Sequence, residues 1–524
     1  MPDEIEIENW YKNKEIEEWL KSKIIRQDKV FKGDENNPSK FMPFSCAVEL
    51  ENLFEFYTDQ TTDELCIYHE DKGIWKPDGE AIIKKIIEKQ LGYQISTRVI
   101  SETIDHIKRH NYIEPSKLNV KKSLINLLNG VLDLETGQLL PHDPKFYFTN
   151  YVDVKYNSEP KTPQKIIDFL IERAEAKDEK FINLLEALAF PLIPDYRIHA
   201  AIMLVGETHR GKTTYLELLQ RIYGKENASH LTMQQLSKAA QEHPFILTSL
   251  IDKTINIADD LPERPISDAG YFKQLTGESP ILAEKKFVNG TISFVNRAKM
   301  YFSANKIPIA YENTDAFYSR WLIIEFNKPI ENEIPQEIFL KELTSEDELS
   351  NLLPLLLWIA NQKLMKNTKF TFSKTAEQNA NIYAKHSNTA KLYCETRLKV
   401  NPEGKILKAA IFSNYLQWCE KHGYLEESEH SFWHTLKTTF ADQENVTERR
   451  KTTDGTIKRF YVGLEFADED EEIEEEEETE VNNKDLLKEY LEIDKLDNLD
   501  NLDNIQIYLK EIYDYIMTIK NLIK

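Results

Sequence analysis

The stretch that decides the fold is AIMLVGETHRGKTTYLELLQRIYG, residues 201–224. The five apolar residues Ala201–Val205 predict a buried strand, and the run from Thr213 onward has the periodicity of a helix. The loop between them has the pattern GxxxxGKT, in which glycines let backbone N–H groups surround phosphates at a helix N-terminus. The sequence therefore predicts a nucleotide-binding loop.

Each part of this loop has an expected role. The ammonium group of Lys212 is expected to reach the β and γ phosphates, and the hydroxyl of Thr213 to bind Mg²⁺. A glycine turn without a ligand is the alternative, but strand, loop and helix occur in the order that a phosphate loop requires. ATP and Mg²⁺ are therefore the expected cofactors. The expected nucleotide-binding residues are Gly206, Glu207, Thr208, His209, Arg210, Gly211, Lys212, Thr213 and Thr214.

A phosphate loop needs acidic residues near its magnesium, and the next apolar strand, TINIA, ends in Asp259 and Asp260. Such a pair holds Mg²⁺ and orients or deprotonates the attacking water. Which aspartate has which role stays open, and Asp259 is the expected magnesium ligand. A helix cap is the alternative, but Pro262 and the loop that follows leave little helix to cap.

Two further polar residues flank apolar strands. Asn305 ends the strand AKMYFSAN, where an amide can polarise the lytic water. Arg320 precedes the last apolar strand, and in a ring it can reach the γ-phosphate held by an adjacent subunit. A surface salt bridge is the alternative for Arg320. The expected catalytic residues are Lys212, Asp259, Asp260, Asn305 and Arg320.

Short apolar strands alternate with helices from about residue 162 to 326. The strand candidates are residues 201–205, 254–258, 299–303 and 321–326. Strands this apolar on both faces suit a parallel sheet covered by helices. The predicted fold class is α/β, with a P-loop core built on a parallel sheet.

The overall composition excludes several classes of protein. The formal net charge of −23 alone would disfavour a nucleic-acid partner, but eleven acidic residues lie between Asp468 and Glu480, so the rest of the chain carries only −12. No window approaches the roughly 18 apolar residues of a membrane span. The start, MPDEIEIENW, lacks an apolar signal core, and the four cysteines form no CxxC pair. We expect reduced thiols, no membrane association and a cytoplasmic location, or the host compartment where a genetic element replicates.

Taken together, GETHRGKT, IADDL, the stretch LTGESPILAEKKFVNGTISFVNRAKMYFSANKIP and AFYSRW resemble superfamily 3 helicases. The resemblance is to the D5-like, phage P4-like group of viruses and plasmids, in which NGVLDLETGQLLPHDP resembles the segment before the motor. It implies an AAA+-type ATPase, a homo-hexameric ring and 3′ to 5′ translocation on DNA.

In that family, two strands before Asn305 project a hairpin into the channel of the ring. Here the segment reads AEKKFVNG, with Lys285, Lys286 and Phe287 near the tip. Two cations and an aromatic ring suit a sequence-independent grip on single-stranded DNA. A solvated charged turn is the alternative.

Many members of the group begin with a primase domain, and this sequence departs from them. The first 150 residues show no convincing acid-x-acid pair on a strand. We therefore expect a helicase without primase activity that works with a separate primase or polymerase.

The region after the motor resembles a winged helix. SFWHTLKTTFA is its candidate recognition helix, and ERRKTTDGTIKRFYV is its candidate wing. A protein-docking module with a basic rim is the alternative. The cations expected to bind DNA here are Arg449, Arg450, Lys451, Lys458 and Arg459.

These observations divide the chain into seven segments. An amphipathic tail follows an acidic linker that cannot bury a core, and it can dock on a partner or on its own ring. The expected segments are 1–40, polar; 41–160, a D5-type α+β domain; 161–335, the ATPase core; 336–385, a helical extension; 386–465, winged-helix-like; 466–483, the acidic linker; and 484–524, a helical tail.

The leading hypothesis is an ATP-dependent DNA helicase that acts on single-stranded and forked DNA. An origin-binding initiator that assembles on DNA without processive unwinding has the same motifs, and strand displacement separates the two. An ATPase that remodels proteins is a third hypothesis. The adjacent lysines of AEKKFVNG disfavour it, because such machines more typically carry an aromatic-hydrophobic pair in the pore.

Overall fold

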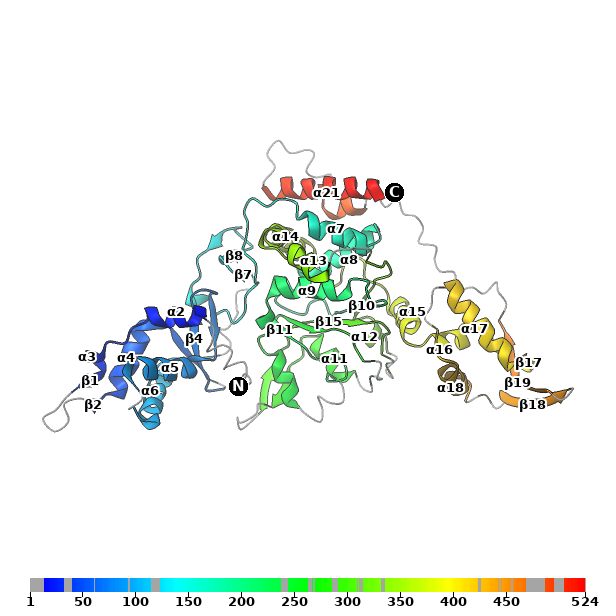
Figure 1. The fold of residues 1–524 in the computed structure, drawn as a ribbon, viewed down its shortest axis with the longest axis horizontal. Helices are drawn as coiled ribbons and strands as arrows, with labels where there is room; N and C mark the ends of the chain where they lie inside the picture. Colours follow the sequence, from blue (N-terminus) through cyan, green and yellow to red (C-terminus); the bar gives the residue numbers. More distant parts are fainter. Residues whose placement is uncertain are drawn as a thin grey trace.

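The computed structural model describes most of the chain. The described residues are 14–32, 40–60, 62–92, 95–114, 123–236, 244–262, 266, 269–284, 291–308, 310, 314–330, 335–422, 426–441, 443, 445–453, 456–467, 486–493 and 504–523. Figure 1 shows a central sheet with the N-terminal region (blue) on one side and the C-terminal domain (yellow to orange) on the other.

The N-terminal region is an α+β unit. Its helices pack their isoleucine-rich faces against a small sheet of order β5-β4-β3-β6, in which β3 and β6 are parallel. The elements are α2 (Lys14–Ser22), α3 (Gln27–Val30), β1 (Phe31–Lys32), β2 (Lys40–Phe41), α4 (Pro43–Leu53), β3 (Phe56–Asp59), β4 (Leu65–His69), β5 (Ile74–Lys76), α5 (Gly79–Leu91), α6 (Thr97–His110) and β6 (Tyr112–Ile113).

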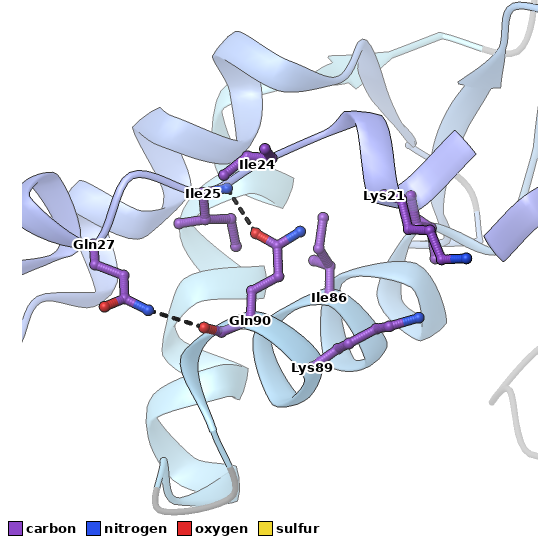
Figure 2. Close-up of a pocket in the computed structure, with 8 residues that line it drawn as sticks. Lys21, Ile24, Ile25, Gln27, Ile86, Lys89 and Gln90 are labelled. Atoms are coloured by element: carbon purple, nitrogen blue, oxygen red, sulfur yellow. Dashed lines mark hydrogen bonds between the residues drawn. The ribbon is translucent and has the colours of Figure 1, made fainter. Parts of the chain in front are cut away.

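Gln90 fastens the segment after α2 to the end of α5. Its Oε1 accepts a hydrogen bond from the backbone N of Ile25 at 2.7 Å, and its carbonyl oxygen accepts one from Gln27 Nε2 at 3.1 Å. Figure 2 shows these bonds beside a cavity of about 350 Å³ lined largely by aliphatic side chains. One glutamine thereby joins the start of the domain to its interior.

A separate three-stranded antiparallel sheet connects this unit to the centre of the molecule. It contains β7 (Leu124–Leu127), β8 (Gly130–Asp133) and β9 (Leu139–Leu140). Gly137, between β8 and β9, has a φ of +69°, in the left-handed region that favours glycine. Residues Ile125, Leu127 and Leu132 of this three-stranded sheet belong to the same core as the helices of the central domain.

The central domain contains a five-stranded sheet of order β11-β12-β15-β10-β16, in which all neighbouring strands are parallel. This confirms the α/β class with a parallel sheet, and all four strand candidates are strands. The strands are β10 (Ala201–Val205), β11 (Ala228–Ser229), β12 (Ile255–Ala258), β15 (Lys299–Ala304) and β16 (Trp321–Glu325).

Helices and short turns cover both faces of this sheet. Alternate strand residues, such as Ile202 and Leu204 of β10, face one core, while Met203 and Val205 face the other. The covering elements are α7 (Gln164–Arg173), α8 (Asp178–Ala189), α9 (Lys212–Tyr223), η5 (Pro244–Leu250), α11 (Gly270–Leu275), α12 (Asp315–Tyr318), α13 (Gln336–Leu343), α14 (Glu346–Ile359) and α15 (Ala376–Ser387). A two-stranded hairpin, β13 (Ile281–Glu284) and β14 (Thr291–Phe294), extends from the same domain.

The C-terminal domain has its own aromatic core, in which Tyr393, Tyr415, Phe432 and Trp433 meet. Its antiparallel sheet has the order β17-β19-β18. Residues 405–407 end β17, because Ile406 pairs with Tyr461 and is buried in that core. The elements are α16 (Thr389–Arg397), β17 (Leu398–Leu407), α17 (Lys408–His422), α18 (Glu429–Thr439), β18 (Thr447–Thr453) and β19 (Thr456–Phe466).

The last two described helices, α19 (Leu486–Tyr490) and α21 (Asn504–Ile523), return to the central domain and join its core. Figure 1 shows α21 (red) lying over α7. The sequence left open whether this segment docks on a partner or on its own ring. In the structure it packs against the central domain of its own chain. Within the described part of the chain, no helix has both the length and the apolar character needed to cross a membrane.

Candidate functional site

The loop from Gly206 to Thr213 leaves β10 at the carboxyl edge of the parallel sheet and enters α9. Gly206 has a φ of +154°, and a Cβ added there would lie 2.2 Å from the carbonyl oxygen of Phe326. Gly211 has a φ of +91° and precedes the first residue of α9. Both glycines are therefore required by the shape of the loop, as expected for a backbone that wraps around phosphates.

The residues between the two glycines hold the loop against the segment that follows β16. Arg210 pairs with Glu207 and donates from Nη1 to the carbonyl oxygen of Asn327 at 2.7 Å. His209 has a left-handed φ of +58°, and its carbonyl oxygen accepts from the N of Ile330 at 3.0 Å. Thr208 lines the adjacent cavity, and Thr214 is buried on α9.

Lys212 lies at the base of the loop, with its residue 5% exposed. Its Nζ donates to the carbonyl oxygens of Gly206 at 2.6 Å and Glu207 at 2.7 Å, and to Asn305 Oδ1 at 2.9 Å. Burial lowers the pKa of this ammonium group, while the nearby charges of Asp260 and Asp259 act in the opposite direction. The fold thus gathers Lys212, Asn305 and both aspartates around one position.

Asp259 is the centre of a small hydrogen-bond cluster. Thr213 Oγ1 donates to Asp259 Oδ2 at 2.9 Å, and Ser303 Oγ donates to Asp259 Oδ1. The backbone N of Asp260 donates to the same Oδ1 at 3.0 Å. The hydroxyl and the carboxylate expected to share a magnesium ion therefore touch each other.

Asp260 differs from its neighbour in backbone conformation. Its φ is +50°, in the left-handed region that costs a non-glycine residue about 1–2 kcal/mol. Its backbone N is held by Ser303 Oγ at 3.2 Å, and Ser303 O accepts from the N of Leu261 at 2.9 Å. These bonds fix the direction in which the chain leaves β12, and with it the position of both carboxylates.

The strand order explains why Asn305 joins this cluster. Because β15 lies between β10 and β12, its carboxyl end separates the loop at Gly206 from Asp259. Gly206 N donates to the carbonyl oxygen of Ala304 at 3.2 Å, which sets the next residue, Asn305, beside Lys212. Asn305 and Lys212 therefore lie together between the ends of β10 and β12.

Arg320 directly precedes β16 and so lies at the amino ends of the strands, opposite to the edge that carries the loop. Its carbonyl oxygen accepts from the N of Ala201 at 2.7 Å, whereas the phosphate loop begins after Val205. Four residue steps along a strand separate the two positions by about 13 Å. Within its own chain Arg320 donates from Nη1 to the carbonyl oxygen of Ala316, so contact with a nucleotide requires the site of another subunit.

The donors at Asp259 fit magnesium. In proteins Mg²⁺ is commonly bound by one or two carboxylates together with substrate phosphates, rather than by a cage made only of protein groups. No group of three or more His, Cys, Asp and Glu side chains able to hold a metal occurs among the described residues. Thr213 and Asp259 therefore supply the kind of partial site that a magnesium-nucleotide complex completes.

Three residues near this edge were not singled out from the sequence. Arg173 of α7 is buried and donates from Nη1 to the carbonyl oxygens of Arg210 at 3.0 Å and Lys328 at 2.6 Å. Ser303 orients Asp259, and Lys306 follows Asn305 into the cavity beside the loop. Ser303 was detectable in principle, because it lies on the same side of β15 as Asn305.

The five cations expected to bind DNA in the C-terminal domain lie on one two-stranded ribbon, here called the cationic ribbon. Arg450 is directly opposite Arg459, and Lys451 is opposite Lys458, while Arg449 faces Phe460. Like charges directly opposite each other on neighbouring strands are destabilising. Arg450 and Arg459 therefore place like charges opposite each other on this ribbon.

Glu448 is the acidic residue that lies among these cations. It accepts from Lys408 of α17 at 3.2 Å and lies within 4.0 Å of Lys437 of α18 and 3.8 Å of Arg459. Across the described residues, no carboxylate forms an ion pair with Arg449 or Arg450. The neighbouring helices thus add two lysines that were not expected from the sequence.

The expected pore residues Lys285, Lys286 and Phe287 lie outside the described residues. The strands on either side of them pair antiparallel, with Glu284 opposite Thr291 as the last pair. Leu282 on this hairpin is 62% exposed. The hairpin itself, as expected before Asn305, is therefore present.

Two family models match the chain. Residues 6–173 match the model described as D5 N terminal like. The chain carries a D5 N-terminal-like domain. Residues 204–320, which include the phosphate loop and the strand ends described above, match a family of unknown function, DUF5906. The first match confirms the D5-like part of the resemblance.

Solved structures of the NrS-1 C-terminal region also align with the chain. One apo structure has a TM-score of 0.45 at 13% identity, covering 80% of this chain and 98% of that one. An A form apo structure has a TM-score of 0.43 at 14% identity, covering 79% of this chain and 97% of that one.

Proposed function

We propose that this chain is an ATP-dependent DNA helicase of the superfamily 3 type that acts in the replication of a virus, plasmid or integrated element. The observation that carries the proposal is the cluster at the carboxyl edge of the sheet. There Lys212 bonds to Asn305 at 2.9 Å and Thr213 bonds to Asp259 at 2.9 Å. Three strand ends supply a phosphate ligand, a magnesium site and a group that orients water.

In this mechanism the backbone of residues 206–211 and Lys212 bind the triphosphate. Thr213 and Asp259 would hold magnesium, which would neutralise the charge that develops on the phosphates. Asn305 orients the attacking water, and Asp259 or Asp260 accepts its proton. Arg320 completes the site of a neighbouring subunit in a homo-hexameric ring, in keeping with its place at the opposite edge of the sheet.

Two features support DNA as the partner. The C-terminal domain has the element order α16, β17, α17, α18, β18, β19 with the sheet order β17-β19-β18, which fits a winged helix whose wing is the cationic ribbon. The D5 N-terminal-like match supports a role in replication. Lys285, Lys286 and Phe287 would contact single-stranded DNA in the channel of the ring.

ATP hydrolysis by the purified protein, with and without single-stranded DNA, tests the proposal. Single-stranded DNA is expected to raise turnover. Lys212→Ala should abolish it, because the charge that reaches the phosphates is removed, and Lys286→Ala should lose only the stimulation. Turnover that ignores both DNA and Lys286 would contradict the helicase assignment.

An origin-binding initiator is the second candidate, and the cationic ribbon favours it because a wing suits duplex DNA. A forked substrate with a labelled strand separates the two candidates. Displacement that depends on ATP supports the helicase. Stable binding to duplex DNA with nucleotide-dependent assembly and no displacement supports the initiator.

A further inference from the structure

A cavity of about 620 Å³ lies beside the phosphate loop and is shared by two domains. The central domain contributes one wall and the C-terminal domain the other. The residues that line it are Glu207, Thr208, Asn305 and Lys306 on the first wall, and Glu426, Glu427, Ser428 and Ser431 on the second. The second wall, here called the α18 lip, is the start of α18 and the residues before it.

The α18 lip is tied to the strand end that carries Asn305. Two residues after Asn305, the N of Ile307 donates to the carbonyl oxygen of His386 on α15 at 2.8 Å. The ring of His386 also bonds to Glu325 at the end of β16 at 2.7 Å. The end of α15 is therefore bonded to the strand ends on either side of β10.

A second set of bonds continues from α15 to the lip. Thr389, which begins α16, bonds to the hydroxyl of Tyr415 at 2.8 Å, and that hydroxyl accepts from the N of Glu427 at 2.8 Å. Glu427 Oε1 accepts from the N of Ala390 at 3.3 Å. All of these groups are buried, so a displacement of α15 carries the lip with it.

Helix α18 connects the lip to the cationic ribbon. Its eleven residues span about 16 Å at 1.5 Å per residue. Ser431 in its first turn lines the shared cavity, and Lys437 in its last turn lies 4.0 Å from Glu448 on the ribbon. One short rigid element thus reaches from the candidate nucleotide site to the candidate DNA surface.

The charges on the two walls determine how the α18 lip is expected to respond to a bound nucleotide. The carboxylates of Glu426 and Glu427 face a cavity beside the loop that is expected to hold a triphosphate. Negative charge on the γ-phosphate would repel them, and the exposed side chain of Glu426 can respond by moving away. Lys306 lines the opposite wall and adds a positive charge to the same cavity.

We propose that the α18 lip is the outer wall of the nucleotide site and that a bound γ-phosphate displaces it, so that nucleotide state is transmitted through α18 to the cationic ribbon. The inference rests on the proposed function of the phosphate loop. It adds Glu426, Glu427 and Lys306 as residues that line the cavity, and His386 as the residue that positions the end of α15.

Binding of a fluorescent ATP analogue to the full chain tests the lip. Glu426→Gln removes one repulsive charge and should tighten binding of the triphosphate by roughly three- to fivefold at low salt, with a smaller gain for the corresponding ADP analogue. Glu420→Gln is the same change at an exposed residue of α17 away from the cavity, and it should have no effect. Equal affinities for the wild type and both variants would overturn the proposal.

Linkage to DNA is the second readout. In the wild type, the affinity for a short duplex should differ with and without a non-hydrolysable ATP analogue, and His386→Ala should reduce that difference while leaving nucleotide affinity unchanged. A duplex affinity indifferent to nucleotide would overturn the inference even if Lys212→Ala abolishes nucleotide binding. Nucleotide binding that survives Lys212→Ala would instead contradict the proposed phosphate loop.

Discussion

At the scale of single residues, the candidate site depends on where each strand ends. Asp259 and Thr213 are 46 residues apart in the sequence, yet they are joined by a hydrogen bond of 2.9 Å. The motifs predicted which residues meet at this edge, because the carboxyl ends of parallel strands lie together. They did not predict Ser303 or Arg173, since a serine within a strand and an arginine in a helix match no motif.

Arg320 gives the sharpest prediction at this scale. If it acts on a neighbouring subunit, Arg320→Ala should reduce ATP hydrolysis by about a hundredfold or more while leaving ATP affinity nearly unchanged. Mixing it with Lys212→Ala subunits should restore part of the turnover, because one subunit then supplies the arginine and another the intact loop. Loss of nucleotide binding by the Arg320→Ala chain alone would contradict a role in trans.

At the scale of elements, apolar runs predicted the central strands well, whereas β17 was not among the predicted strands. The apolar residues of β17 alternate with polar ones only weakly, and Ile406 is assigned to a strand by its pairing with Tyr461. That pairing joins residues 55 positions apart, which no local pattern contains. The cationic ribbon was predicted from the sequence, whereas Lys408 and Lys437 join it only through tertiary packing.

The cationic ribbon predicts a specific salt dependence. Arg450→Ala and Arg459→Ala should each weaken binding to duplex DNA and lower the slope of log K against log salt by about one. Lys391→Ala, on α16 and away from the ribbon, is the matched control. Slopes that are the same in all three variants would favour a protein-docking role for this surface.

At the scale of the whole molecule, the tail is part of the central core. Lys520 of α21 forms a buried ion pair with Asp178, the hydroxyl of Tyr515 donates to Asp168 at 2.9 Å, and that of Tyr490 donates to Glu186 at 3.0 Å. Amphipathic spacing predicted helices here but left the docking partner open. The partner was not deducible, because the acidic residues that receive the tail lie more than 300 positions earlier.

Lys520→Met should therefore destabilise the protein. It leaves the carboxylate of Asp178 buried without its partner, a change that typically costs about 3–5 kcal/mol. The double variant Lys520→Met with Asp178→Leu should recover much of the loss, and Glu511→Gln, an exposed change on the same helix, should have little effect. Thermal and urea unfolding measure all three. Equal stability of the wild type and Lys520→Met would show that α21 is not part of the core.

The contact of Glu226 in the central domain with Lys72 and Lys76 in the N-terminal region should weaken in acid. Burial alone raises the pKa of Glu226, but the charges of Lys76 and Lys72 outweigh it and lower the pKa to about 2. A lowered folded-state pKa stabilises the contact above the ordinary value of 4.5, and the contribution is lost as pH falls from 4.5 toward 2.

Because the side chain of Glu226 is 45% exposed, we expect Glu226→Gln to cost only about 1 kcal/mol at pH 7. Limited proteolysis between the two domains and thermal unfolding measure the effect. The difference between wild type and variant should shrink as pH falls from 4.5 and vanish only below about pH 2, where the carboxyl group of Glu226 is uncharged. A difference that persists there would assign the effect to packing.

The return of α21 to α7 also sets the order in which the protein can be completed during synthesis. Ile512 and Ile516 fill the same core as Ile166 and Leu170. The central domain emerges from a ribosome long before these residues are synthesised. Part of its apolar surface therefore stays uncovered until the C-terminal domain and the acidic segment have been made. Ribosome-bound chains ending near residue 467 should therefore bind chaperones and be cleaved by protease more readily than the released full chain.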